Sequence, residues 1–322
     1  MYRLSTALWF LAFVCAGPVQ AAESYPGKPV RIVVGFPPGG VTDVLARPIA
    51  QKLSEKHGVQ FIVENRPDAT GQIANEAVVK AAPDGHTLLA APGSSISSYP
   101  HMRKSMPYDS LADLAPVAEI ARFAYVLVRH PAVPARSIKE LVALAKSRPG
   151  NLTYASPGVG TAFHLSGELL QNMAKIDMVH VPYKGGAAAM TDMLGGRVDL
   201  LFYSLAVVQP LIESKRLFAI AVTGLERMPQ LPDVPTIDES GLRGYEMTGW
   251  QGLFAPSKTS QTVVAQLNGD INALFSSGSL KDLWSSQGMA FVPNDVAQFR
   301  KLVRADYERY ARLVRIAGIK PE

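Results

Sequence analysis

Pro29-Val-Arg-Ile-Val-Val-Gly-Phe36 is a short apolar run rich in β-branched residues, and Pro37-Pro-Gly-Gly40 ends it. Such a run is typical of a strand that is buried on both faces, as in a parallel sheet. Apolar residues then recur at helical spacing from Val41 to Leu53, with Pro48 inside the stripe. The stretch therefore predicts a strand, a glycine turn and a helix, which together open an α/β fold.

The same alternation continues downstream and occurs twice. Strands over 60–63 and 86–91, with a helix over 73–82 between them, complete a first βαβαβ unit. A second α/β unit is predicted from four further strands, over 152–155, 178–181, 198–202 and 219–222.

Two longer extended runs separate and follow these units, over 117–129 and 247–254. Each run is at least as long as a long β-strand. We therefore expect both runs to cross from one domain to the other. Helices predicted over 261–275 and 296–316 then return the chain to the first domain. The sequence predicts an α/β fold of two sheets joined by two crossing strands, with domains over 23–124 plus 248–322 and over 125–247.

The first segment has the features of an export signal. Arg3 precedes the apolar run Ala7–Val14, which is too short to span a bilayer, and small residues end at Ala22. We predict a signal peptide over 1–22; a buried N-terminal helix is the alternative interpretation. Cys15, the only cysteine, lies in this segment, so the mature chain has no thiol nucleophile, cysteine metal site or disulfide.

The composition excludes several functions. The 322 residues carry 32 Lys and Arg against 27 Asp and Glu, a net charge of +5, and no basic run interleaved with aromatic residues indicates nucleic-acid binding. The six histidines have no metal-ligand spacing, and no G-x-S-x-G, P-loop or H-E-x-x-H motif occurs. We therefore expect no enzyme activity, no metal and no cofactor.

Six loops follow predicted strands, where α/β proteins bind ligands: 36–42, 65–71, 92–97, 156–161, 183–186 and 203–204. Backbone N–H groups at helix starts and hydroxyl groups would hold a small carboxylate there, with Lys184 as the main cation. The candidate residues of this kind are glycines and hydroxyl residues: Gly39, Gly40, Ser94, Ser95, Ser156, Gly160, Thr161, Gly186 and Ser204. Each could instead have a structural role, Thr161 as a helix N-cap above all, and Trp250 fits ordinary packing as well as a site.

Several stretches resemble the substrate-binding proteins of tripartite tricarboxylate transporters, the Bug family. The resemblance lies in Tyr25–Gly40 with Thr42-Asp43, in Val63-Glu-Asn-Arg-Pro67, in Ala82-Pro-Asp-Gly-His-Thr-Leu-Leu89, in Ser156-Pro-Gly-Val-Gly-Thr161 with His164-Leu165, in Val179-His-Val-Pro-Tyr-Lys-Gly-Gly186, and in Ala221-Val-Thr-Gly224 followed by Leu231-Pro-Asp-Val-Pro-Thr236. It covers nearly the whole mature chain, in order.

The resemblance implies a monomeric periplasmic binding protein of the type II, two-domain fold. Such a protein closes on a small organic carboxylate and delivers it to the membrane subunits of its transporter. The family's ligand contacts correspond to residues 36–43 and 156–164 and to residues near 183–187, which adds these candidates: Phe36, Pro38, Asp43, His164, Tyr183 and Ala187.

Two departures from the family pattern concern the ligand. Tyr203 stands where many members have an aspartate that could meet a ligand amine, so it argues against an amino acid and would narrow the pocket or stack on its contents. Asp68 and Thr70 stand where glycines are usual. The alternative function is an exported α/β enzyme that acts on a small carboxylate through Ser156, Thr161 or His164; a sensor domain would need a further module that the sequence does not show.

Overall fold

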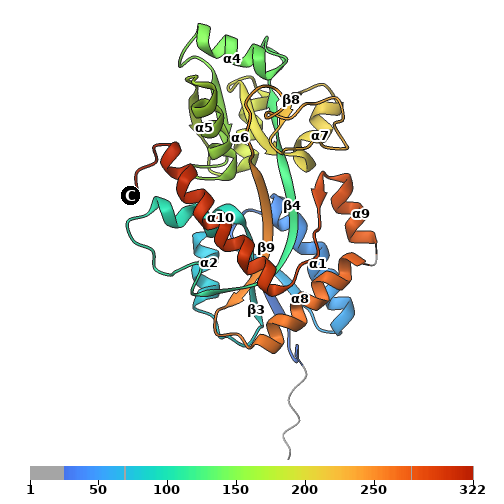
Figure 1. Cartoon of the computed structure of the whole chain (residues 1–322). Helices are drawn as coiled ribbons and strands as arrows, with labels where there is room; N and C mark the ends of the chain where they lie inside the picture. The colour runs from blue at the N-terminus through green and yellow to red at the C-terminus, as the bar shows by residue number, and fades with distance from the viewer. Residues whose placement is uncertain (1–24, 69, 277, 322) are drawn as a thin grey trace, which may run out of the picture.

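The chain folds into two lobes that share a pair of long strands (Figure 1). The structure is a computed structural model and describes residues 25–68, 70–276 and 278–321. The signal peptide predicted over 1–22, including Cys15, lies outside the described residues.

The first lobe opens with alternating strands and helices. They are β1 (Val30–Val34), α1 (Val41–His57), β2 (Phe61–Asn65), α2 (Gln72–Val79) and β3 (Thr87–Pro92). β1 is the central strand and pairs in parallel with both β2 and β3, so that Ile32 lies opposite Val63 and Leu88. Ile32 is fully buried, as the apolar run predicts for a strand covered on both faces. The βαβαβ prediction is confirmed.

Two strands connect the lobes. β4 (Leu114–Arg129) pairs antiparallel with β9 (Thr248–Pro256) over residues 114–124 and with β7 (Leu200–Ser204) over residues 125–129. One strand therefore belongs to the sheets of both lobes, and β9 lies beside it (Figure 1). Both runs predicted to cross between the lobes are strands.

The second lobe repeats the α/β alternation. Its elements besides β7 are α4 (Ile138–Ser147), β5 (Thr153–Ser156), α5 (Ala162–Ala174), β6 (Val179–Pro182), α6 (Gly186–Leu194), α7 (Leu205–Glu213) and β8 (Phe218–Val222). β5 pairs in parallel with β6 and β7, while β8 pairs antiparallel with β4. The helices α5 and α6 therefore begin beyond the carboxyl ends of parallel strands, where ligand sites of α/β sheets lie.

After β9 the chain returns to the first lobe. This segment contains α8 (Gln261–Ser276), α9 (Ser279–Ser286), β10 (Met289–Ala290) and α10 (Val296–Ile316). The long helix α10 packs against β4 in the first lobe and also contacts α5 in the second lobe (Figure 1). It therefore contacts both lobes in the region where they meet.

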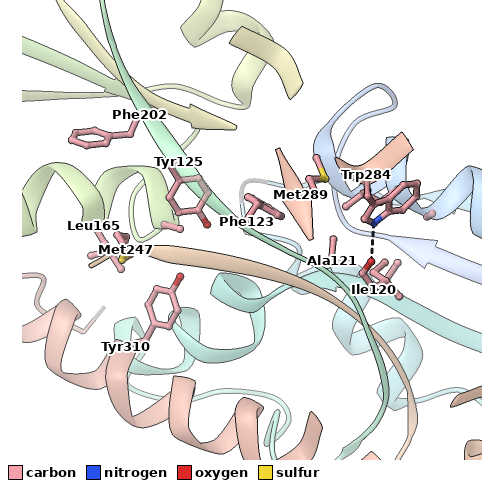
Figure 2. Packing of buried hydrophobic residues seen from close by; sticks show 14 of the residues in the cluster. Ile120, Ala121, Phe123, Tyr125, Leu165, Phe202, Met247, Trp284, Met289 and Tyr310 are labelled. Carbon is pink, nitrogen blue, oxygen red and sulfur yellow. Dashed lines mark hydrogen bonds between the residues drawn. The ribbon is translucent and has the colours of Figure 1, made fainter. Parts of the chain in front are cut away.

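A continuous hydrophobic core follows β4 from one lobe to the other. Figure 2 shows Phe123 and Tyr125 of β4 in this core, with Trp284 of α9 on one side and Tyr310 of α10 on the other. Trp284 is 1% exposed, and its Nε1 donates a hydrogen bond to the Ile120 carbonyl oxygen at 2.8 Å. The core thereby holds β4 in place, and side chains of β4 face the space between the lobes.

Two local predictions were wrong. Residues 93–97, predicted as a loop, form the short helix α3 (Gly93–Ser97), followed by the 3-10 helix η1 (Tyr99–Met102). Tyr203 and Ser204, predicted to begin a loop, complete β7. Glycine and serine indicate a loop in isolation, but both fit the first turn of a helix that starts directly from a strand. The helix α9 and the strand β10 were not predicted.

Candidate ligand-binding site

A cavity of about 500 Å³ lies between the lobes. Its wall comes from both lobes and from the two connecting strands: Phe36, Pro37, Gly40, Val41, Thr42, Pro67, Asp68, Pro92, Gly93, Ser94, Phe123, Tyr125, Pro157, Thr161, Ala162, Phe163, Lys184, Gly185, Gly186, Tyr203, Gly249, Trp250 and Gln251. This volume is ordinary for a small-molecule site. A ligand held there would touch both lobes at once.

Three helices of nine residues or more begin at the wall of the cavity, as does the short helix α3 at Gly93. α1 begins at Val41, α5 at Ala162 and α6 at Gly186. Gly40 and Gly185 precede α1 and α6, and neither helix start has a side-chain cap. The first N–H groups of a helix carry partial positive charge and have no partner within the helix, so they bind anions. Helix starts from both lobes therefore converge on a site suited to one small anion.

Side-chain charge contributes little to this site. Among the described residues that line the cavity, Lys184 and Asp68 are the charged ones. Lys184 lies two residues before the first residue of α6 and so adds positive charge to the helix start. The site thus resembles one for a carboxylate held by neutral donors, without the cationic cluster that a polyphosphate requires.

Aromatic side chains form much of the remaining wall. The Tyr203 and Phe163 rings stack with centroids 4.7 Å apart, and Tyr125 meets Phe163 edge-on at 4.9 Å. Burial raises the pKa of Tyr203 to about 12 and also raises the pKa of Tyr125, so both phenols stay protonated at neutral pH. Their hydroxyl groups can donate hydrogen bonds into an otherwise apolar wall.

Trp250 of β9 links the cavity to α10. Its Nε1 donates to Asp306 Oδ2 at 2.9 Å, and Asp306 in turn pairs with Arg309, whose Nη2 donates to the Thr248 carbonyl at 3.0 Å. Gly93 leaves room for the indole, because a Cβ on Gly93 would lie 2.5 Å from it. Trp250 is therefore an anchored part of the site as well as a packed side chain.

Six residues of the predicted site line the cavity: Phe36, Gly40, Ser94, Thr161, Gly186 and Tyr203. Ser95 and Gly160 line a narrow side cavity that shares Phe36, Ser94 and Thr161 with the main one. The remaining predicted residues do not line either space: Pro38, Gly39, Asp43, Ser156, His164, Tyr183, Ala187 and Ser204. The ligand contacts that the resemblance implies for them stay a prediction.

Asp43 holds the loop between β1 and α1 in place. Its carboxylate accepts hydrogen bonds from the Gly39 N–H, from Arg47 and from Asn65. Burial opposes ionisation of Asp43, but these three donors outweigh burial and lower the pKa of the carboxyl below its usual range. The carboxylate thus positions the loop that carries Phe36 and Gly40 to the cavity.

A buried polar cluster lies behind the start of α5. Ser156 Oγ is 2.7 Å from His180 Nε2, and His180 stacks on His164 with ring centroids 3.9 Å apart. His164 Nδ1 accepts a hydrogen bond from the Gly160 N–H at 3.0 Å. Ser156 is fully buried and Thr161 accepts from the His164 N–H, so these side chains shape the loop before α5.

His180 makes the stability of the fold depend on pH. Burial, and then the charge of His164, lower the pKa of His180 from 6.5 to about 3, against an opposing effect of Glu168. Between these values the unfolded chain binds a proton that the folded chain does not, so the free energy of unfolding falls as the pH falls. We expect His180→Gln to make this fall less steep between pH 6 and pH 4, as measured by urea unfolding; equal slopes in both proteins would contradict the assignment.

Sequence reasoning missed part of the aromatic wall, namely Phe123, Tyr125 and Phe163. Phe123 and Tyr125 lie two residues apart in β4 and so share one face. That spacing was a usable signal, since the strand was predicted to cross between the domains. Gln251 was also missed; its Oε1 accepts a hydrogen bond from Thr42 Oγ1 at 3.0 Å and ties β9 to the start of α1.

Comparison with known proteins places the chain among transport receptors. A sequence model described as "Tripartite tricarboxylate transporter family receptor", TctC, matches residues 45–319. The chain belongs to this family of transporter receptors. Among curated relatives, a UPF0065 protein in the tcbD-tcbE intergenic region of Pseudomonas sp. strain P51 is 38% identical over 92% of this chain and 88% of its own length, and BugT of Bordetella pertussis is 34% identical over 95% and 94%.

Solved structures of similar proteins share the fold. Rpa4515 of R. palustris with adipate is 34% identical, with a TM-score of 0.88 over 92% of this chain and all of that chain. The periplasmic binding protein BugD is 32% identical, with a TM-score of 0.85 over 92% and 100%. MatC of Rhodopseudomonas palustris with bound malate is 29% identical, with a TM-score of 0.83 over 90% and 100%. The two-domain, type II binding-protein fold is thereby confirmed.

Two further observations concern this TctC receptor. Within the described part of the chain, no three His, Cys, Asp or Glu side chains gather as a metal ion would need. Of the helices described, none is long and apolar enough to cross a bilayer.

Proposed function

We propose that this TctC receptor captures a small organic carboxylate in the cavity between its lobes and delivers it to the membrane subunits of a tripartite tricarboxylate transporter. The observation that carries the proposal is the convergence of three helix starts, from both lobes, on one cavity. Because the donors come from both lobes, a bound anion favours the arrangement in which the lobes are closed on it. The adipate and malate in the structures of Rpa4515 and MatC support a carboxylate as the ligand.

The remaining predictions complete this proposal. The chain would be exported by the signal peptide over 1–22, act in the periplasm as a monomer, and open and close between domains over 23–124 plus 248–322 and over 125–247. The polar cluster around Ser156 is consistent with a receptor that has no catalytic activity. Ser156 is buried, and its Oγ donates to the Gly158 carbonyl at 3.0 Å rather than reaching the cavity.

A thermal-shift screen followed by calorimetric titration tests the proposed function. The mature chain, refolded from denaturant to remove any co-purified ligand, is screened against benzoate, adipate, malate, citrate, aspartate and glutamate. We expect at least one amine-free carboxylate to bind with a Kd near or below about 1 μM, since four or five hydrogen bonds of ~1.5–3 kcal/mol to a charged group suffice. Aspartate and glutamate should bind more weakly, because Tyr203 offers no acid to a ligand amine and the Asp68 carboxylate already accepts from N–H groups at the start of α2. Tightest binding of an amino acid, or turnover of the bound acid, would contradict the proposal.

A further inference from the structure

We propose that the ligand is an aromatic acid with a single carboxylate. The negative charge of Asp68 in the cavity wall disfavours ligands that carry two carboxylates. This inference rests on the proposed function and names the substrate class for the same cavity. It follows from two features of the wall, the aromatic side chains and the place of the Asp68 carboxylate.

The apolar part of the wall is suited to a flat ring. Phe36, Phe123, Phe163 and Trp250 supply apolar ring surface, and Tyr125 and Tyr203 add ring surface with a hydroxyl group at its edge. The rings contact one another in stacked and edge-on pairs, which are the geometries that a ligand ring could continue. A polar aliphatic acid would lose its water against these ring faces with few replacement hydrogen bonds.

Asp68 occupies the start of α2 in the first lobe. Its Oδ1 accepts from the backbone N–H groups of Thr70 at 2.7 Å and Gln72 at 3.2 Å, and also from Gly71. Its Oδ2 accepts from the Ile73 N–H at 2.6 Å. The N–H groups at the start of α2 are therefore used by the chain's own carboxylate and are closed to a ligand.

The remaining donors suit a single carboxylate. The starts of α1, α5 and α6, with Lys184 beside α6, make one positive region that spans the two lobes. At the part of the wall formed by Pro67 and Asp68, a second carboxylate on the ligand would meet the negative charge of Asp68. This position is unfavourable, because Asp68 repels a like charge.

Calorimetric titration of the mature chain with four matched acids tests the inference. Benzoate and cyclohexanecarboxylate differ in aromaticity, while terephthalate and adipate add a second carboxylate to a ring and to a chain. We expect benzoate to bind about fivefold tighter than cyclohexanecarboxylate, the gain typical of an aromatic pair. We expect benzoate to bind at least about tenfold tighter than terephthalate or adipate, because the Asp68 charge repels a second carboxylate.

The variant Asp68→Asn isolates the role of the charge, because asparagine keeps an oxygen acceptor for the start of α2. It should improve terephthalate binding about tenfold relative to benzoate. Asp84→Asn is the matched control: Asp84 also accepts from a backbone N–H, that of His86, but lies outside the cavity wall, so it should leave this ratio unchanged.

The possible outcomes separate the inference from the proposed function. Tighter binding of adipate or terephthalate than of benzoate by the wild-type chain would overturn the inference and leave a carboxylate receptor standing. An unchanged ratio in Asp68→Asn, with the wild-type preference as expected, would overturn the role of Asp68. If none of the four acids binds, and the wider screen is equally negative, the proposed function itself fails.

Discussion

Replacing Gly186 by alanine should abolish tight binding of the carboxylate, with a loss of about 100-fold in affinity. A Cβ at this position would lie 1.6 Å from the Tyr203 hydroxyl oxygen. Tyr203 cannot retreat freely, because it is 8% exposed and stacks on Phe163. The first turn of α6 and the ring must therefore separate. Losing one charge-assisted hydrogen bond and part of the ring contact costs ~3 kcal/mol, which is about 100-fold.

Gly195→Ala is the matched control for this substitution. Gly195 lies at the other end of α6, has a right-handed helical backbone, and a Cβ there would meet only ordinary contacts, the nearest at 3.4 Å from the Thr191 carbonyl oxygen. The Gly195→Ala variant should bind the carboxylate with the affinity of the wild type. Calorimetry measures both affinities, and circular dichroism checks that both variants are folded. Wild-type affinity in a folded Gly186→Ala variant would show that the start of α6 is not part of the site.

Replacing Asp306 by alanine should lower the free energy of unfolding by about 3 kcal/mol, the usual cost of removing one partner from a buried ion pair. Burial raises the pKa of Asp306, although Arg309 and Trp250 act in the opposite direction. The substitution leaves the Arg309 guanidinium, whose side chain is 24% exposed, without its carboxylate, and leaves Trp250 Nε1 without an acceptor. Urea unfolding followed by circular dichroism measures the change.

Two further variants make this prediction specific. Asp306→Asn keeps an acceptor for Trp250 and should be less destabilising than alanine. Glu55→Ala removes a carboxylate from an exposed pair with Lys52 and should leave stability nearly unchanged. An Asp306→Ala variant as stable as Glu55→Ala would contradict the view that α10 anchors the cavity wall through Trp250.

The fold could be predicted from the sequence because its elements depend on local patterns. The apolar run before Gly40 specifies a buried strand, and the extended runs over 117–129 and 247–254 are too regular and too long for loops. Short segments were harder, since α3 and α9 form where tertiary packing outweighs their weak local preference. Trp284 illustrates this, because its burial against Ile120 is a contact between distant parts of the chain.

Part of the candidate site could be predicted from local sequence patterns, and part could not. Glycine loops at helix starts can be read from sequence, so Gly40, Thr161 and Gly186 were expected at the cavity that they line. Side-chain direction cannot be read in the same way. The Tyr183 hydroxyl donates to Asp192, and the Asp68 carboxylate turns back onto its own helix start, although both residues lie in predicted loops.

A crystal structure of the mature chain grown with benzoate tests the central claim most directly. We expect one molecule between the lobes, with its carboxylate within hydrogen-bond distance of N–H groups at the starts of α1 and α6 and its ring against Phe163, Tyr203 or Trp250. Benzoate bound at saturation outside this cavity, or held by donors of one lobe alone, would contradict the account.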